Sequence, residues 1–173
     1  MKKLHPLIAI VMGSDSDLNI MEEAAKFLEE MHVPFEIKIL SAHRTPEMVQ
    51  EYVTKLKDRN VKIIIAGAGK AAHLPGVIAA YTTLPVIGVP IKAQTSLNGW
   101  ESILSILEMP PGIPVATVGI NAARNAAILA VQILSISDEK YAQNLTQYRI
   151  NLKTKVVNAN EKIKNMKYKY LIN

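Results

Sequence analysis

The sequence predicts an α/β fold, a three-layer sandwich built on a five-stranded parallel sheet and followed by a C-terminal helix. Three observations carry this prediction. Short apolar runs alternate with amphipathic segments of helical period along the 173 residues. The first run is apolar throughout, which is typical of a strand covered on both faces. Hydrophobic residues make up 49% of the chain and charged residues 20%, as in a globular protein.

The first two strand–helix units follow from the periodicity. A buried strand is expected over residues 6–12, and a helix with one apolar stripe begins at Asp17. Residues 35–40 alternate like a second strand. Thr45 is then expected to cap a helix whose first turn contains Pro46, where the missing N–H costs nothing.

The pattern continues to the end of the chain. Strands are expected over 61–66, 85–89 and 113–118, and helices over 74–81, 100–107, 122–134 and about 138–165. Parallel strands joined by right-handed helical crossovers define a flavodoxin-like or Rossmann-like architecture, whose ligands bind beyond the carboxyl ends of the strands. With no linker or repeat, residues 1–173 are expected to form one domain.

Composition excludes several classes of function. The chain has no cysteine, which rules out disulfides and thiolate chemistry and is compatible with a reducing cytoplasm, the expected location. The net charge of +5 raises the alternative of a nucleic-acid partner. Because much of the basic excess lies in 153–169, where Tyr168 is the single aromatic residue, we expect no nucleic-acid binding. No apolar stretch is long enough to span a membrane, so no membrane partner is expected.

The last two helices leave two interpretations open. The alanine-rich segment 122–130 permits close helix approach, either in the core or at a subunit contact. The final helix combines its basic residues with an apolar stripe at Leu145, Tyr148 and Leu152. This pattern is typical of a solvated face, and it also suits a helix that packs on a neighbouring subunit.

Two segments at strand-to-helix junctions carry the strongest functional signal. Residues 13–17, Gly-Ser-Asp-Ser-Asp, offer hydroxyls and carboxylates to a sugar, and residues 41–46, Ser-Ala-His-Arg-Thr-Pro, place a guanidinium beside an imidazole. Backbone N–H groups converge at such junctions and favour an anion. A simple turn is the alternative for the first segment, whereas a calcium loop fails because Ile20 and Lys26 occupy its required Gly and Glu positions.

A third segment, Gly-Ala-Gly-Lys-Ala-Ala at 67–72, matches the dinucleotide-binding fingerprint only weakly, since the expected downstream acid is missing. It is better interpreted as a backbone cradle for a small anionic or carbonyl group. His43 and His73 are both expected at this edge of the sheet, while His5 and His32 are expected in solvent. No histidine pair has zinc-site spacing, so no metal site is expected.

Together these segments resemble the PurE family of purine biosynthesis. The resemblance rests on 13–17, on 41–46 and on Ala-Gly-Ala-Gly-Lys-Ala-Ala-His-Leu-Pro-Gly at 66–76, with further matches through 88–90, 105–106, 109–110 and 112–114. It covers nearly the whole chain and is strongest to the class I bacterial type, the N5-carboxyaminoimidazole ribonucleotide mutases. One position departs from the pattern, because this chain has Lys70 where the family usually has glycine.

The resemblance implies an isomerase of IMP biosynthesis that needs no metal or organic cofactor. It would move the carboxyl group of N5-carboxyaminoimidazole ribonucleotide from the exocyclic nitrogen to ring carbon C4, giving 4-carboxy-5-aminoimidazole ribonucleotide. The implied substrate contacts are Ser16, Ser41 and Arg44 for the phosphate, Asp17 for the ribose, and Ser14, Ala68, Gly69, Lys70, Ala71, His73 and Leu74 around the carboxylate. The family forms homo-octamers.

His43 is the expected catalytic residue. An imidazole titrates near neutral pH, so one ring could give a proton to the nitrogen and later take one from C4. Carbon dioxide would stay confined between the two steps. Three alternatives stay open: an aminoimidazole ribonucleotide carboxylase that uses carbon dioxide directly, a non-catalytic module that binds phosphorylated sugars, and a nicotinamide-dependent enzyme.

Overall fold

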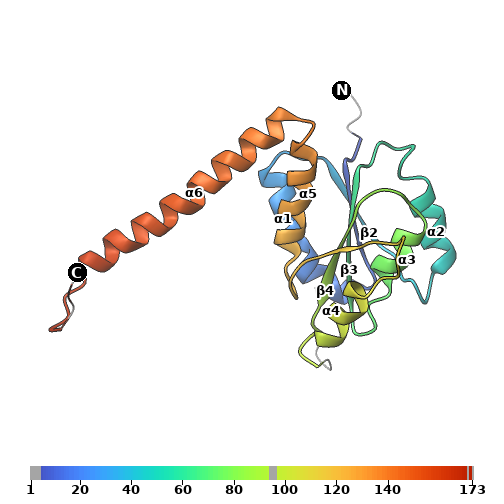
Figure 1. Cartoon of the computed structure of the whole chain (residues 1–173), viewed down its shortest axis with the longest axis horizontal. Coiled ribbons are helices and arrows are strands. Elements are labelled where there is room, and N and C mark those ends of the chain that lie inside the picture. Colours follow the sequence, from blue (N-terminus) through green and yellow to red (C-terminus); the bar gives the residue numbers. More distant parts are fainter. Residues whose placement is uncertain (1–4, 94–96, 171, 173) are drawn as a thin grey trace.

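The computed structural model describes residues 5–93, 97–170 and 172, and it contains the predicted five-stranded parallel sheet (Figure 1). The strands are β1 (Ile8–Met12), β2 (Phe35–Ile39), β3 (Ile63–Gly69), β4 (Val86–Ile91) and β5 (Ala116–Thr117). The helices are a short 3-10 helix η1 (Asp15–Asp17), α1 (Leu18–Glu30), α2 (Pro46–Thr54), α3 (Leu74–Ala80), α4 (Trp100–Leu107), α5 (Ala123–Ser135) and α6 (Glu139–Lys164).

The strands are ordered β2-β1-β3-β4-β5, and every pairing is parallel. This is the flavodoxin-like order. After β1 the chain moves to one side of the sheet, to β2, and after β3 it moves to the other side, to β4 and β5. The predicted fold class is confirmed. The crevice that such an order opens lies beyond the carboxyl ends of β1 and β3, where the predicted segments 13–17 and 67–72 lie, and the segment 41–46 follows the neighbouring strand β2.

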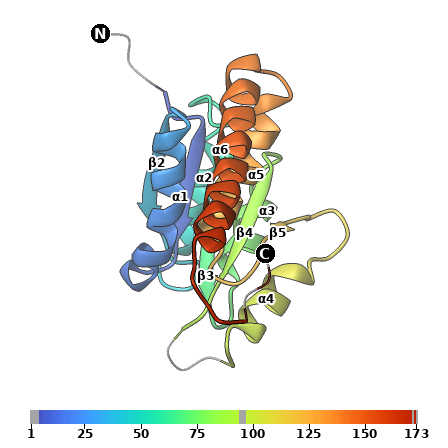
Figure 2. The same ribbon diagram turned by 90° about the vertical axis from the view of Figure 1, so that its left-hand side faces the viewer.

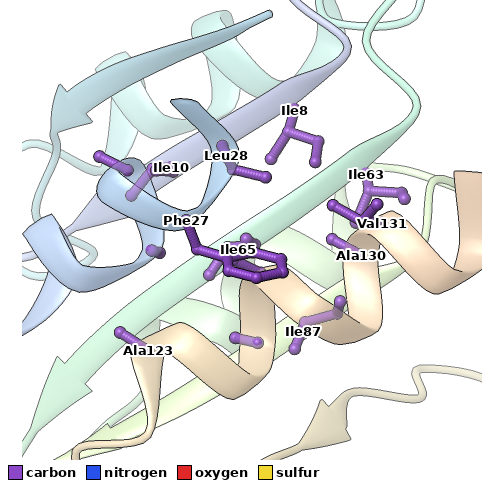
Figure 3. Packing of buried hydrophobic residues seen from close by; sticks show 14 of the residues in the cluster. Ile8, Ile10, Phe27, Leu28, Ile63, Ile65, Ile87, Ala123, Ala130 and Val131 are labelled. Carbon is purple, nitrogen blue, oxygen red and sulfur yellow. The ribbon is translucent and has the colours of Figure 1, made fainter. Parts of the chain in front are cut away.

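Two layers of helices cover the sheet. Helices α1 and α5 lie side by side on one face, and α2, α3 and α4 cover the other (Figures 1 and 2). Figure 3 shows Phe27 of α1 and Val131 of α5 packed over Ile65 and its neighbours in the sheet. Each such buried side chain contributes about 1.5–3 kcal/mol to stability, so packing on both faces holds the sheet that carries the loops at its edge.

Two predictions about the strands need correction. The fifth strand was expected over 113–118, but only two of its residues pair with β4, because Pro114 and Pro90 lack N–H groups that would extend the ladder. The segment 67–69 was expected to follow a strand and instead completes β3. Its glycines fit there because a Cβ on Gly69 would lie 3.1 Å from the carbonyl oxygen of Ile91.

Helix α6 leaves the body of the molecule as a long arm (Figure 1). Its start is confirmed at Asp138, whose side chain accepts a hydrogen bond from the N–H of Lys140 at 3.0 Å. Of the predicted apolar stripe, Leu145 and Tyr148 pack on the core, whereas Leu152 is exposed. No helix among the described residues is both long and apolar enough to cross a lipid bilayer.

Candidate active site

Loops after four strands meet at the carboxyl edge of the sheet and line a cavity of about 360 Å³. The residues predicted as catalytic or substrate-binding all line this cavity, namely Ser14, Ser16, Asp17, Ser41, His43, Arg44, Ala68, Gly69, Lys70, Ala71, His73 and Leu74. The structure therefore brings the predicted residues together. Their individual roles stay predictions.

The loop after β1 is closed by its own side chains. The Ser14 hydroxyl accepts a hydrogen bond from the N–H of Ser16 at 3.3 Å and donates one to the Asp15 carboxylate at 3.0 Å. The Asp17 carboxylate is half-buried, and this burial raises its pKa, partly offset by hydrogen bonds from the Ser14 and Ser16 positions. An acceptor is thus held at the cavity wall, and no ion pair with another described residue neutralises it.

The loop after β2 is anchored to the loop after β1. The Arg44 guanidinium donates from Nη2 to the carbonyl oxygen of Gly13 at 2.9 Å, and the Arg44 backbone N–H donates to Ser41 Oγ at 3.2 Å. Thr45 is the N-cap residue of α2, as predicted, but its side chain makes no capping hydrogen bond. Its hydroxyl is already occupied, since it accepts from the Ser41 N–H at 3.0 Å and donates to the Ser41 carbonyl at 3.2 Å. These contacts orient a cation beside Ser41, an arrangement that suits phosphate.

Two imidazoles meet across the cavity. His43 Nε2 lies 2.9 Å from His73 Nδ1, and the rings are edge to face at 75° with centroids 5.0 Å apart. In this contact one nitrogen donates and the other accepts, depending on the tautomer. The two histidines are 30 positions apart in sequence and come from the loops after β2 and β3. The geometry orients His43 and leaves both rings accessible from the cavity.

Lys70 begins the loop after β3 in an unusual backbone conformation. Its φ is 55°, in the left-handed region that costs a residue with a Cβ about 1–2 kcal/mol. Glycine would adopt this conformation without that strain, which explains physically why the family pattern has glycine here. The His73 backbone N–H then donates to the Ala71 carbonyl at 2.9 Å and closes the turn into α3.

Sequence reasoning missed three features of the site. Ala93, two residues beyond β4, lines the cavity, although the rule that ligands bind at strand ends could have found it. The Gly13 carbonyl as a partner for Arg44 and the direct contact between His43 and His73 carried no sequence signal. Within the described ranges, no group of three or more His, Asp or Glu side chains is arranged to hold a metal ion.

Residues 7–155 match the AIR carboxylase family. The N5-carboxyaminoimidazole ribonucleotide mutase of Pyrococcus horikoshii is 55% identical over 166 residues, covering 96% of this chain and 93% of that protein. The phosphoribosylaminoimidazole carboxylase of Candida albicans is 51% identical over 166 residues, but these are 29% of that protein. The crystal structure of PurE from Treponema denticola has a TM-score of 0.84 and 30% identity, covering 92% of this chain and 99% of that one.

Proposed function

The chain belongs to the AIR carboxylase family, as its resemblance to PurE predicted, and on this premise we propose that it converts N5-carboxyaminoimidazole ribonucleotide into 4-carboxy-5-aminoimidazole ribonucleotide in purine biosynthesis. The reaction is an intramolecular transfer. The observation that carries the proposal is the cavity that places His43 against His73 on one side and beside Arg44 on the other. Direct carboxylation is not favoured, because relatives of this chain's own length are mutases.

Phosphate and ribose bind at the β1 and β2 loops in this proposal. Ser16, Ser41 and Arg44 hold the phosphate, for which Arg44 is already oriented by its bond to Gly13. The Asp17 carboxylate accepts hydrogen bonds from the ribose hydroxyls. The imidazole ring of the nucleotide then lies toward His43, with Ser14, the backbone amides of residues 68–71 and the segment 73–74 around its carboxylate.

His43 carries the proton in both halves of the reaction. The bond between the exocyclic nitrogen and the carboxyl carbon breaks, its electron pair stays on nitrogen, and the nitrogen takes a proton from His43. Ring carbon C4 next attacks the released carbon dioxide, and the C4 proton passes back to His43. The imidazole ends as it began, so no metal or organic cofactor is required.

Confinement supplies the rest of the catalysis. Carbon dioxide held beside C4 reacts without a collision from solution, and excluded water keeps it from escaping. In the single chain both His43 and His73 are exposed. We therefore propose that a neighbouring subunit completes the cover.

The homo-octamer implied by the family resemblance is supported by apolar side chains that one chain leaves exposed. On α4, Trp100, Leu104 and Leu107 are 63%, 48% and 60% exposed, and on α6 Val156 is 63% exposed. Apolar patches of this kind suit burial between copies of the same chain. Sedimentation should find an oligomer, and a fully active monomer would contradict this part of the proposal. The cytoplasmic location stays a prediction.

The variant His43→Asn tests the proposal. It keeps a polar side chain but cannot shuttle the proton, so turnover of the N5-carboxylated nucleotide should fall about a thousand-fold while nucleotide affinity changes far less. His32→Asn is the matched control, because His32 is exposed and does not line the cavity. Turnover at the wild-type rate in His43→Asn would leave the mechanism without its proton carrier.

Supplying the candidate substrates separately decides between the two reactions. The mutase consumes the N5-carboxylated nucleotide without added bicarbonate. Turnover of aminoimidazole ribonucleotide with bicarbonate, and none of the N5-carboxylated compound, would favour the direct carboxylase instead. Nucleotide binding with no turnover of either would favour the non-catalytic module.

A further inference from the structure

Lys70 is a cavity residue that packing and pairing do not explain. It adopts a strained left-handed conformation immediately after β3, and its side chain is exposed. The ammonium group forms no hydrogen bond or ion pair with any other residue in the described part of the chain. Backbone strain that the fold itself does not need is often found where a side chain serves a ligand.

The charges around the cavity are arranged on two sides. Arg44 is fixed on the side of β1 by its 2.9 Å bond to the Gly13 carbonyl, whereas Lys70 extends from the end of β3. Among the lining residues that the structure describes, Asp17 is the one carboxylate. Two cations against one carboxylate give the lining an excess of positive charge, which favours a ligand that carries more than one anionic group.

The position of Lys70 indicates which anionic group it serves. It stands three residues before His73, whose Nδ1 contacts His43 Nε2 at 2.9 Å. A cation on this segment therefore lies on the side where the proposed proton transfer takes place. Under the proposed function the phosphate belongs to the Arg44 side, and the group that changes position beside the histidines is the carboxylate.

We infer that Lys70 is a specificity-determining residue whose ammonium group binds the carboxylate of substrate and product. This inference rests on the proposed function and deepens it. The migrating group is an anion in the substrate and in the product but neutral carbon dioxide in between. Lys70 therefore stabilises the two bound nucleotides more than the intermediate state, so it lowers KM and does not raise kcat.

The test compares two nucleotides that differ by the carboxylate, 4-carboxy-5-aminoimidazole ribonucleotide and aminoimidazole ribonucleotide. Calorimetric affinities are measured in a His43→Asn background, so that neither is converted. Lys70→Gln should weaken binding of the carboxylated nucleotide about five- to ten-fold and of the other less than about two-fold. The loss should shrink at high salt, and Lys70→Arg should retain most of the affinity. With His43 present, Lys70→Gln should raise KM without lowering kcat.

Three further variants separate charge from backbone effects. Lys62→Gln removes a cation just before the amino end of the same strand, far from the cavity, and should change neither affinity. Lys70→Gly relieves the strain but also removes the cation, so it should weaken binding as Lys70→Gln does. His32→Gly is its matched control, since His32 has the same φ of 55° outside the cavity.

Equal losses for both nucleotides, or no loss for either, would overturn the assignment of Lys70 while leaving the proposed function intact. Failure of both nucleotides to bind the parent His43→Asn protein would instead overturn the proposed function, and the role of Lys70 with it. A lowered kcat at unchanged KM would also contradict the inference, because it would place Lys70 in the chemical step.

Discussion

The two ends of strand β3 serve the molecule in different ways. Its first residues, Ile63 to Ile65, are fully buried and alternate between the two helical layers. Its last residues, Gly67 to Gly69, carry no side chain larger than a methyl group and lead to the strained Lys70 at the cavity. Stability is thus concentrated at one end of the strand and the proposed site at the other. Substitutions along β3 should separate the two.

Ile65→Ala should produce the largest loss of stability. Ile65 is fully buried in the cluster with α1 and α5, so removing its methyl groups leaves a cavity and lowers the free energy of unfolding by about 2–5 kcal/mol. Urea unfolding measures this loss. Nucleotide affinity of the folded protein should not change, and a parallel loss of affinity would break the separation between the two ends of the strand.

Gly69→Ala should cost less stability and also impair the site. The added Cβ would lie 3.1 Å from the carbonyl oxygen of Ile91, and backbone must move to relieve the contact, at about 1–3 kcal/mol. Because Gly69 lines the cavity, the same movement should weaken nucleotide binding. Urea unfolding and calorimetry measure the two effects.

Gly119→Ala is the control for this substitution, since a Cβ there meets nothing closer than the Ala122 Cβ at 3.7 Å. It should be nearly neutral in both measurements. If Gly69→Ala lost stability but kept its full nucleotide affinity, the carboxyl end of β3 would contribute to packing and not to nucleotide binding.

The contrast between the buried part of the sheet and its carboxyl edge also explains which features could be predicted from the sequence. Runs such as Ile8 to Met12 are apolar because both faces are covered, so local pattern and tertiary environment agree and the position of such a strand could be predicted. The location of the candidate site also followed from topology, because the carboxyl ends of parallel strands all lie at the same edge of the sheet. Every predicted site residue therefore reached one cavity.

Details that depend on long-range contacts were beyond the sequence. The length of β5 depends on how many of its residues can pair with β4, and Gly67 to Gly69 belong to a strand because they pair with residues 89–91 of β4. The contact between His43 and His73 depends on the conformations of two loops that are remote in sequence. Spacing along the chain encodes none of these distances.

Substitution of Asp17, a residue of the candidate site, should have the smallest effect on stability. Burial raises the pKa of its carboxyl group above the ordinary value of 3.8, so the folded state binds a proton more tightly than the unfolded state. Stability from this group is therefore present below about pH 3.8 and is lost as pH rises through the folded pKa. At pH 7 the ionised group opposes folding.

Asp17→Asn should accordingly match the wild type near pH 3 and exceed it at pH 7, by only a few tenths of a kcal/mol because the group is partly solvated. Urea unfolding at the two pH values measures the difference, with Asp58→Asn, which lies outside the cavity, as the control for removing one negative charge. Nucleotide affinity should fall in Asp17→Asn, since the proposed ribose acceptor is lost. If Asp17→Asn were less stable at pH 7 and bound the nucleotide as well as the wild type, Asp17 would stabilise the fold and would not serve binding. The carboxyl edge of the sheet would then contribute to stability as its buried strands do.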